Sequence, residues 1–509
     1  MLESKDVIQL NDRDNVVIAK HDLSEGDQIT TGSLTFTLKQ IVPQGHKLAI
    51  ADIAPGSSVI KYGQIIGQAN ALIMPGEHVH SHNMGMAEYQ KEVTFESTND
   101  FVSRDDRVRT FDGYVRADGQ VGTRNYIGVL TSVNCAGSVA RFICDSIEKS
   151  GVLDQFENVD GVIPIVHGTG CGMSGSNDGY DILKRTLLGY ASNANFGGIL
   201  LLGLGCEVMQ VSSLVETCEK SKRGAFNHLV IQAEGGTTRT VKRGVEMVKE
   251  IATTANQTHR ESASVANLIV GMQCGGSDSY SGITANPALG YASDLLVKHG
   301  GTSILSETSE IYGAEYLLTS RAVSQETSDK LTSRIQWWEA YCEKHGGELD
   351  NNPSPGNKRG GLTTILEKSL GAVAKGGSAP LVDVYQYAEK IDKKGFVFMD
   401  SPGYDPCSVT GQVASGANLI VFTTGRGSVS GYKPVPCIKL ATNTPMYERL
   451  KEDMDLNCGD IVTDGKSIAQ KGEELFELII ATASGEQTKS EKLGFGGVEF
   501  VPWQIGAVM

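Results

Sequence analysis

The sequence carries no excess of positive charge. Its 509 residues include 45 Lys and Arg against 60 Asp and Glu, so the formal net charge is −15. Nucleic acids and anionic membrane surfaces are bound by basic patches, and this balance therefore argues against both partners. The chain also lacks an apolar run approaching the roughly 18 residues of a membrane span, and it does not start with a basic segment followed by an apolar one. We therefore expect a cytoplasmic protein.

The glycine-rich and cysteine-containing stretches do not form the common nucleotide or zinc motifs. No P-loop is present, and the GLGC at residues 203–206 is too short for a dinucleotide fingerprint. The strand-end cysteines described below do not have the compact C-x-x-C spacing of a zinc ribbon. In a reducing compartment, the ten cysteines are expected to be ligands, catalytic groups or core residues rather than disulfides.

Hydrophobic patterning divides the chain into three domains. Residues 1–96 alternate short β-branched runs with Gly, Asp and Pro turns, which predicts a small all-β domain. A polar, charge-rich segment at 97–110 is expected to be a linker. From Phe111, short apolar runs alternate with segments of helical spacing, which predicts α/β domains with largely parallel sheets. We expect a central α/β domain at 111–350 and a C-terminal α/β domain at 351–509.

Four of the predicted strands end in a cysteine. These residues are Cys135, Cys171, Cys206 and Cys274. Parallel strands point their carboxyl ends at one edge of the sheet, where open α/β sheets bind ligands, so we expect the four thiols to gather there. Any one of them is more simply explained as a small buried residue, because free cysteine is among the most buried types. Four equivalent positions together favour a functional cluster.

Histidines are concentrated in one stretch of the N-terminal domain, GEHVHSHN at residues 76–83. His78, His80 and His82 occupy alternate positions of the last predicted strand and would therefore face the same side. Imidazole suits iron, manganese and zinc, so the three side chains could supply part of a metal's ligand set. A solvated edge strand explains the pattern equally well, and the sequence does not decide between the two.

Polar residues suited to binding an organic anion lie in several glycine-rich turns. The stretch CGGSDSYSGITANPALG at 274–290 predicts a loop whose amides and hydroxyls hold a carboxylate, although an ordinary glycine-rich turn has a similar composition. Basic side chains in other such turns could complete the clamp, although single Lys and Arg residues in loops are usually just solvated. The predicted substrate-binding residues are Arg124, Ser277, Asp278, Thr284, Asn286, Lys358 and Arg426. Glu307 and Glu310 follow an apolar run, where one could be a general base or metal ligand, although a helix cap is the commoner role.

Six stretches, taken in order, are specific enough to indicate a family. They read GEHVHSHN, DGQVGTRNYIGVLTSVNC, GLGCE, MQCGGSDSYSGITANPALG, NPSPGNKRGGLTTILEKSLG and FTTGRGSVSGYKPVPCIKLATN. In these stretches the chain resembles the altronate dehydratase/galactarate dehydratase family of sugar-acid hydro-lyases, over essentially its whole length. The resemblance implies that the all-β N-terminal domain is a SAF-type (β-clip) domain.

The resemblance also implies a reaction and a cofactor. The reaction is loss of water from a six-carbon aldonic or aldaric acid, by removal of the C2 proton and the C3 hydroxyl, with Fe²⁺ or else Mn²⁺ as the metal. The histidine-rich stretch is similar to the altronate branch, whereas GMQCGGSD and GYASDLLV look closer to the galactarate branch. Because a whole candidate ligand set outweighs framework residues, we expect D-altronate as substrate and 2-dehydro-3-deoxy-D-gluconate as product. Galactarate or another sugar acid is the alternative.

In this hypothesis the N-terminal domain carries its histidines over the cysteine edge. His78 and His80 would bind the metal with the four cysteines, and His80, His82 and Glu307 would move protons. An iron–sulfur cluster on three or four of the cysteines is the competing cofactor. A sugar-acid sensor would not need a cysteine-lined edge, and a metal-storage or thiol-redox protein would not need anion-binding loops. We expect a small sugar acid as partner, without nucleic acid or membrane, and leave a homo-oligomer open.

Overall fold

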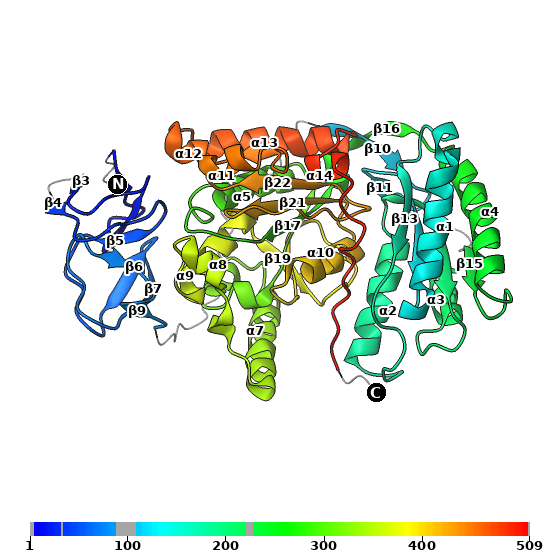
Figure 1. Cartoon of the computed structure of the whole chain (residues 1–509), viewed down its shortest axis with the longest axis horizontal. Coiled ribbons are helices and arrows are strands. Elements are labelled where there is room, and N and C mark those ends of the chain that lie inside the picture. The colour runs from blue at the N-terminus through cyan, green and yellow to red at the C-terminus, as the bar shows by residue number, and fades with distance from the viewer. Residues whose placement is uncertain (1–4, 32–33, 88–107, 220–226, 507–509) are drawn as a thin grey trace.

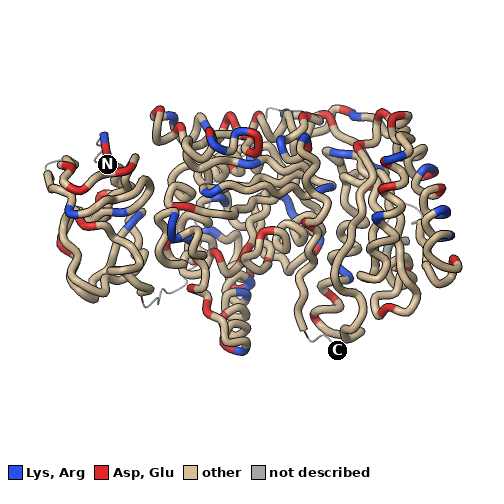
Figure 2. The backbone as a smooth tube through the Cα atoms, in the orientation of Figure 1, with Lys and Arg blue, Asp and Glu red and all other residues tan. Residues whose placement is uncertain are grey.

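Three domains follow one another along the computed structural model, which describes residues 5–31, 34–87, 108–219 and 227–506 (Figure 1). The N-terminal and second domains lie at opposite ends of the molecule, and the C-terminal domain lies between them. Acidic and basic residues are intermixed over all three domains (Figure 2). Among the described residues, no helix combines the length and the apolar character needed to cross a membrane. The expected linker at 97–110 falls almost entirely outside the described residues.

The N-terminal domain consists of short β-strands, and every strand pair described in it is antiparallel. One sheet has the order β1-β2-β5-β8, a second β6-β7-β9, and a third pairs β3 with β4. The strands are β1 (Val7–Ile8), β2 (Val16–Ala19), β3 (Gln28–Thr31), β4 (Leu34–Thr37), β5 (Lys47–Ala49), β6 (Ser58–Lys61), β7 (Gln64–Ala69), β8 (His78–Val79) and β9 (Met84–Gly85). Their β-branched and aliphatic side chains form two small cores, which confirms the predicted all-β domain.

The second domain has a four-stranded parallel sheet with the order β13-β12-β14-β15. Its strands are β12 (Tyr126–Thr131), β13 (Gly161–Ile165), β14 (Phe196–Gly203) and β15 (Asn227–Val230), and its helices are α1 (Gly137–Ser150), α2 (Asp178–Ala191), α3 (Val211–Glu219) and α4 (Thr237–Ala255). Side chains of α1 and α4 share one core with the sheet, and those of α2 and α3 share another. Both faces of the sheet are therefore covered, as apolar runs at strand positions require.

A small antiparallel sheet joins the second domain to the C-terminal domain. Its order is β11-β10-β16, from β10 (Thr110–Val115), β11 (Val121–Gly122) and β16 (Arg260–Ser264). Strand β10 lies before the four-stranded sheet in the chain and β16 lies after it. Their pairing therefore brings together the two ends of the second domain, at the point where the chain enters the C-terminal domain.

The C-terminal domain is built on a seven-stranded parallel sheet with the order β19-β20-β18-β17-β21-β22-β23. Its strands are β17 (Ile269–Cys274), β18 (Thr302–Leu305), β19 (Leu381–Tyr385), β20 (Gly395–Met399), β21 (Leu419–Thr424), β22 (Cys437–Ala441) and β23 (Leu456–Asn457). The predicted α/β class is confirmed. The expected division at residue 350 would, however, separate β17 and β18 from the other five strands, so the sheet itself begins near Ile269.

Helices cover both faces of this sheet. They are α5 (Ala285–Lys298), α6 (Tyr316–Thr319), α7 (Gln325–His345), α8 (Pro355–Arg359), α9 (Ile365–Val373), α10 (Asp405–Ala414), α11 (Thr444–Arg449), α12 (Asp460–Thr463), α13 (Ile468–Ala483) and α14 (Lys489–Lys492). Helices α5 and α13 pack on one face, and α10 packs on the other, where it shares a core with α2 of the second domain. The chain then ends in an extended segment whose Trp503 and Ile505 pack against that shared core.

Candidate active site

A buried cluster of one thiol and two carboxyl groups lies at the carboxyl edge of the seven-stranded sheet. Cys274 ends β17, and Glu307 and Glu310 follow the end of β18, the neighbouring strand. Each residue offers one ligand atom, and the three atoms lie within 4.8 Å of one another. We call these residues the thiol–carboxylate triad. Adjacent parallel strands have brought together side chains that are well separated in the sequence, at the edge where such sheets bind ligands.

Glu307 has the most unusual environment of the three. Its backbone has φ 72° and ψ 70°, a left-handed conformation that costs a residue other than glycine about 1–3 kcal/mol. Its side chain is fully buried, and neither carboxylate oxygen accepts a hydrogen bond from the part of the chain that the structure describes. Burial raises the pKa of this carboxyl group well above its ordinary value, and the nearby Glu310 raises it further. Such a group is suited to take up a proton near neutral pH.

Two buried lysines face the triad. Lys368, in α9, donates from Nζ to Glu310 Oε1 at 2.7 Å, and Lys375 Nζ lies 2.9 Å from Cys274 Sγ and 3.8 Å from Glu307 Oε2. We call them the lysine pair. Burial lowers their pKa values, but the attraction of the triad outweighs burial and raises both. The pair therefore keeps its positive charges although both side chains are buried.

These charges also give the acidic groups of the site different pKa values. Burial raises the pKa of Glu310, but the attraction of Lys368 and Lys375 is stronger and lowers it overall. Burial raises the pKa of the Cys274 thiol to about 12. Asp405, at the start of α10, has a pKa raised to about 6 by burial and by Glu310. A carboxyl group of lowered pKa thus lies beside groups of raised pKa, the arrangement that acid–base catalysis requires.

The N-terminal domain docks on α9 through Glu367, a buried carboxylate directly before Lys368 in the chain. Glu367 accepts hydrogen bonds from Lys47 Nζ at 2.8 Å and from Lys61 Nζ at 2.9 Å. All three side chains are 0% or 1% exposed. Tyr62 also packs against this surface, since a Cβ on Gly282 would lie 2.6 Å from the Tyr62 hydroxyl oxygen. Only glycine at position 282 therefore allows this close approach.

Four imidazoles of the N-terminal domain gather at this interface. The ring centroids of His46, His78 and His80 lie 5.0, 5.2 and 5.4 Å apart, and His82 lies 5.5 Å from His78. We call these four residues the imidazole cluster. The histidines of GEHVHSHN do gather, but the predicted placement on one strand is wrong: only His78 lies in β8, and His80 and His82 lie in the bend and turn before β9. His46 precedes β5 and was not predicted.

Contacts with the C-terminal domain set the tautomers of two of these rings. His46 Nε2 lies 3.2 Å from the Arg359 carbonyl oxygen, and His80 Nε2 lies 2.8 Å from the Lys358 carbonyl oxygen. A carbonyl oxygen only accepts, so each Nε2 carries the hydrogen and, in the neutral ring, each Nδ1 keeps a lone pair. Burial lowers the pKa of His46 to about 4 and that of His78 to about 3, which keeps the rings neutral. Both Nδ1 atoms already have partners, since His46 Nδ1 lies 2.9 Å from His78 Nε2 and His80 Nδ1 lies 3.0 Å from Ser81 Oγ.

A small cavity connects the two domains at this place. Its lining includes Tyr62 from the N-terminal domain, Cys274 from the triad, Glu367 and Lys368 from α9, and Ser277 from the loop after β17. The cavity thus places residues of the docking contact and of the triad around one space. We therefore treat the triad and the lysine pair as one candidate site, and the imidazole cluster lies at the same domain interface, against the carbonyl oxygens of Lys358 and Arg359.

Most of the side chains predicted for the carboxylate-binding loop hold the loop itself. Asp278 accepts hydrogen bonds from Ser281, Thr442 and Asn443 at 2.9–3.0 Å. Thr284 and Asn286 donate to backbone carbonyl oxygens at 2.7 and 2.8 Å. Ser277, Asp278 and Asn286 all line the cavity. The glycine-rich composition therefore reflects a tightly bonded buried turn that forms part of the cavity wall, and a role of these residues in substrate binding stays a prediction.

Lys358 and Arg426 lie beside the candidate site. The Lys358 carbonyl oxygen accepts from His80, and Arg426 is an exposed residue whose backbone N–H donates to Gly276, in the loop after β17, at 2.9 Å. Their part in substrate binding stays a prediction.

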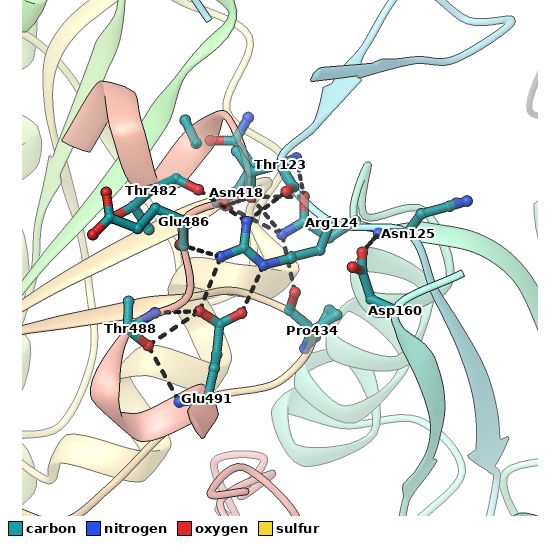
Figure 3. A network of polar contacts seen from close by, with 12 residues as sticks. Thr123, Arg124, Asn125, Asp160, Asn418, Pro434, Thr482, Glu486, Thr488 and Glu491 are labelled. Atoms are coloured by element: carbon teal, nitrogen blue, oxygen red, sulfur yellow. Dashed lines mark hydrogen bonds and ion pairs between the residues drawn. The ribbon is translucent and has the colours of Figure 1, made fainter. Parts of the chain in front are cut away.

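Arg124 lies elsewhere, between the second and C-terminal domains (Figure 3). Its Nε and one terminal nitrogen donate to the two Glu491 oxygens at 2.6 and 2.9 Å. Its other three N–H groups donate to the carbonyl oxygens of Thr123, Thr482 and Glu486. All five donors are used within the protein, so the geometry assigns Arg124 to domain packing instead of the predicted carboxylate clamp.

The four strand-end cysteines do not gather at one edge. Cys135, Cys171 and Cys206 follow strands of the four-stranded sheet and are exposed, whereas Cys274 is buried in the seven-stranded sheet. The prediction of a single four-thiol edge is therefore wrong, because the strands belong to two separate sheets. Each cysteine does follow a parallel strand, but only Cys274 is the last residue of its strand, and the other three lie a few residues beyond the strand end.

Three important residues were not predicted: Glu367 and the lysine pair. Their signal is weak but present, since Glu367, Lys368 and Lys375 interrupt the otherwise apolar and small-residue run LTTILEKSLGAVAKGG. Charged residues inside such a run are expected to be paired when they are buried. The partners lie far away in the sequence and could not be identified from this run.

Comparison with known protein families covers nearly the whole chain. The model described as "Altronate/galactarate dehydratase SAF domain" matches residues 5–87. "D-galactarate dehydratase/Altronate hydrolase, second domain" matches 113–256, and "D-galactarate/Altronate dehydratase, C-terminal" matches 265–508.

Individual relatives agree with these matches. The altronate dehydratase of Escherichia coli (strain K12) is 35% identical over 494 residues, which cover 96% of this chain and 97% of the relative. The altronate dehydratase of Bacillus subtilis (strain 168) is 34% identical, with the same shares covered. The galactarate dehydratase (L-threo-forming) of Escherichia coli (strain K12) is 36% identical and covers 96% of this chain and 94% of the relative.

Proposed function

Because the chain belongs to the altronate/galactarate dehydratase family and is a sugar-acid hydro-lyase, we propose that it converts D-altronate to 2-dehydro-3-deoxy-D-gluconate at the candidate site. The reaction removes a proton from C2 and a hydroxyl from C3, after which the enol becomes a keto group. The C2 proton is weakly acidic because the adjacent carboxylate is already negative. The site must therefore supply a base, positive charge for the developing enolate, and an acid for the leaving hydroxyl.

Glu307 is the base in this proposal, and the environment of its carboxylate is the observation that carries the proposal. Its two carboxylate oxygens are buried without a hydrogen-bond donor among the described residues, and its pKa is raised by burial. A base of raised pKa is the stronger proton acceptor, which suits a proton as weakly acidic as that on C2. The left-handed backbone at Glu307 holds the carboxylate in this position at a cost in stability, as expected for a functional group.

The lysine pair supplies positive charge in the proposed site. Lys368 and Lys375 are 7% and 1% exposed, so their charges act in a medium of low polarity. They would bind the substrate carboxylate and offset the second negative charge that develops when Glu307 removes the C2 proton.

The thiol–carboxylate triad fits a divalent metal in one respect that the structure shows directly. Both oxygens of Glu307 are buried and accept no hydrogen bond within the described ranges, and they lie beside a thiol and a second carboxylate. Mixed sulfur and oxygen donors suit iron better than magnesium or calcium. When bound, Fe²⁺ would polarise the substrate's carboxylate or 2-hydroxyl group as a Lewis acid. Cys274 would first have to lose its proton, which couples binding to pH.

The imidazole cluster supplies the acid in this proposal. His80 and His82 are the predicted proton donors. Burial lowers the pKa of His80, so its ring, once protonated, is a stronger acid toward a leaving hydroxyl. His78 and His80 are also the alternative metal ligands, because imidazole binds iron and manganese. Substitution of His80 by Ala should therefore lower turnover, iron content or both.

The neutral rings also support altronate over galactarate. Altronate has one carboxylate, whereas galactarate has one at each end. The lysine pair suits one carboxylate, and the neutral imidazoles offer hydrogen bonds to hydroxyl groups instead of charge for a second carboxylate. Sequence identity does not favour either substrate, since it is 35% to an altronate dehydratase and 36% to a galactarate dehydratase.

The test is an anaerobic assay of the Fe²⁺-supplemented protein with D-altronate and, separately, galactarate. Formation of a 2-keto-3-deoxy acid from altronate is the expected result. Product from galactarate alone would refute the proposed substrate, and product from neither would refute the proposed reaction.

The base is tested by Glu307→Gln, which should abolish both turnover and exchange of the C2 hydrogen with D₂O. The matched control is Glu477→Gln, the same change at an exposed ion pair with Arg109. Retention of C2 exchange in Glu307→Gln would show that another residue is the base.

A further inference from the structure

Three exposed thiols lie on neighbouring loops of the second domain, away from the candidate active site. Cys135 follows β12, Cys171 follows β13 and Cys206 follows β14, each a few residues beyond the strand end. Because β12 lies between the other two strands in a parallel sheet, the three loops leave the same edge side by side. The proposed dehydration uses none of these thiols.

Backbone contacts bind the three loops to one another. Asn134 N–H, next to Cys135, donates to the Thr169 carbonyl oxygen at 2.9 Å. Met209 N–H, in the loop of Cys206, donates to the Gly170 carbonyl oxygen at 3.1 Å. Gly170, next to Cys171, has φ 99°, and a Cβ there would lie 2.2 Å from the Ser132 carbonyl oxygen. The loops therefore touch within three residues of every cysteine.

A buried carboxylate makes this edge rigid. Glu207, adjacent to Cys206, is 3% exposed and accepts hydrogen bonds from the Ser132 hydroxyl at 2.8 Å and the Gly205 N–H at 2.5 Å. It thereby joins the loop after β14 to the end of β12. Rigid support of this kind holds ligand side chains in a fixed arrangement before the ligand binds.

The topology places the thiols where an open parallel sheet takes a ligand. The chain passes from β12 to β13 on one side and then crosses to β14 on the other, which creates a switch point between β12 and β14. Ligands bind at such points, outside the carboxyl ends of the strands. Helix α1 begins at Gly137, directly after the turn that contains Cys135, and its positive end favours thiolates and other anions. Gln232 adds an N–H donor 3.6 Å from Cys206 Sγ.

We propose that Cys135, Cys171 and Cys206 ligate an iron–sulfur cluster at the carboxyl edge of the second domain. A single ion needs its ligand atoms close together, and in the described residues only the thiol–carboxylate triad has three such atoms within 4.8 Å. A cluster is larger than an ion and bridges thiolates that are spread more widely, as these are. With three protein thiolates, one iron keeps a coordination position for a ligand from solution. The site lies in a different sheet from Cys274, and it does not depend on the proposed substrate.

The test measures iron and acid-labile sulfide in the full-length protein, purified anaerobically and reconstituted with iron and sulfide. We expect equimolar iron and sulfide, a visible absorption band of thiolate-to-iron charge transfer that bleaches in air, and a paramagnetic signal after reduction with dithionite. Single substitutions Cys135→Ser, Cys171→Ser and Cys206→Ser should each remove most of the sulfide. The control Cys342→Ser, on α7, should retain it, and so should Cys274→Ser.

A second measurement needs no variant and so does not depend on correct folding of a mutant. Iodoacetamide should alkylate the three cysteines in the protein before reconstitution and leave them unmodified afterwards, as mapped by mass spectrometry. Absence of labile sulfide after reconstitution, zinc in its place, or unchanged alkylation would overturn the proposal. Dehydratase activity is measured separately, with and without the cluster. Failure of the protein to form a cluster can therefore be distinguished from failure to dehydrate the sugar acid.

Discussion

Replacement of Glu367 by Gln should detach the N-terminal domain from the C-terminal domain. Glu367 is the carboxylate on α9 that receives Lys47 and Lys61, both from the N-terminal domain, at 2.8 and 2.9 Å. Breaking a buried ion pair from one side costs about 3–5 kcal/mol, because the remaining charge is left buried and unpaired. Here two ammonium groups would be left, so the docking equilibrium should weaken by roughly 10²- to 5 × 10³-fold.

Hydrogen–deuterium exchange measures this effect where it occurs. In Glu367→Gln, the amides of β5 and β6 and of the start of α9 should lose protection, while the strands of the second domain keep theirs. The matched control replaces Lys47, Lys61 and Glu367 by Met together. Replacing all the charges of a buried network with apolar side chains is often neutral or stabilising, so this control should keep the domain docked. If the single variant kept wild-type protection and a wild-type unfolding midpoint, the reasoning would be refuted.

Three further predictions concern stability. Attraction of the two lysines outweighs burial and lowers the pKa of Glu367 from 4.5 to about 2, so below pH 4.5 the unfolded chain takes up a proton that the folded chain does not. The stabilisation by Glu367 should therefore be complete above pH 4.5 and fall as the pH drops toward 2. Denaturant titrations at a series of pH values measure this, and the free energy of unfolding should depend less on pH in Glu367→Gln. Arg124→Ala should lose about 3–5 kcal/mol in urea unfolding, because it leaves Glu491 buried without its partner; unchanged stability with a raised KM would instead support substrate binding. Gly170→Ala should lower the unfolding midpoint more than Gly119→Ala, since both have positive φ but only position 170 also has a backbone oxygen 2.2 Å from the new Cβ; equal losses would contradict this.

The sequence was sufficient for the class of each domain and for the type of position that each cysteine occupies. Short β-branched runs separated by turns indicate antiparallel strands, and apolar runs that end in glycine or cysteine indicate parallel ones. It was not sufficient to show which sheet a strand joins. Strand β17 has the same local pattern as β14, yet it pairs with β18 and β21, because β16 returns to β10 and closes the second domain first. Sheet membership depends on these distant pairings.

The candidate site was predictable where a local pattern carried it, as in the histidine stretch and at Glu307. The lysine pair was not, because a lysine in a sequence is read as solvated unless its acidic partner is known. Lys375 is 1% exposed and lies 2.9 Å from Cys274, which is far from it in the chain. Conversely, Arg124 had the local features of an anion-binding residue, and its five donors are used by partners that local sequence does not reveal.

One turn of α9 connects domain docking to the chemistry of the site. Consecutive residues of an α-helix point about 100° apart, so Glu367 and Lys368 can serve different neighbours from adjacent positions. Glu367 binds the lysines of the N-terminal domain, and Lys368 binds Glu310 of the triad. Any shift of the helix that follows undocking would therefore also move Lys368 and change the charge beside Glu310 and Glu307. In the proposed function, the N-terminal domain therefore supplies the imidazole cluster and, through its contact with Glu367, also fixes the position of Lys368.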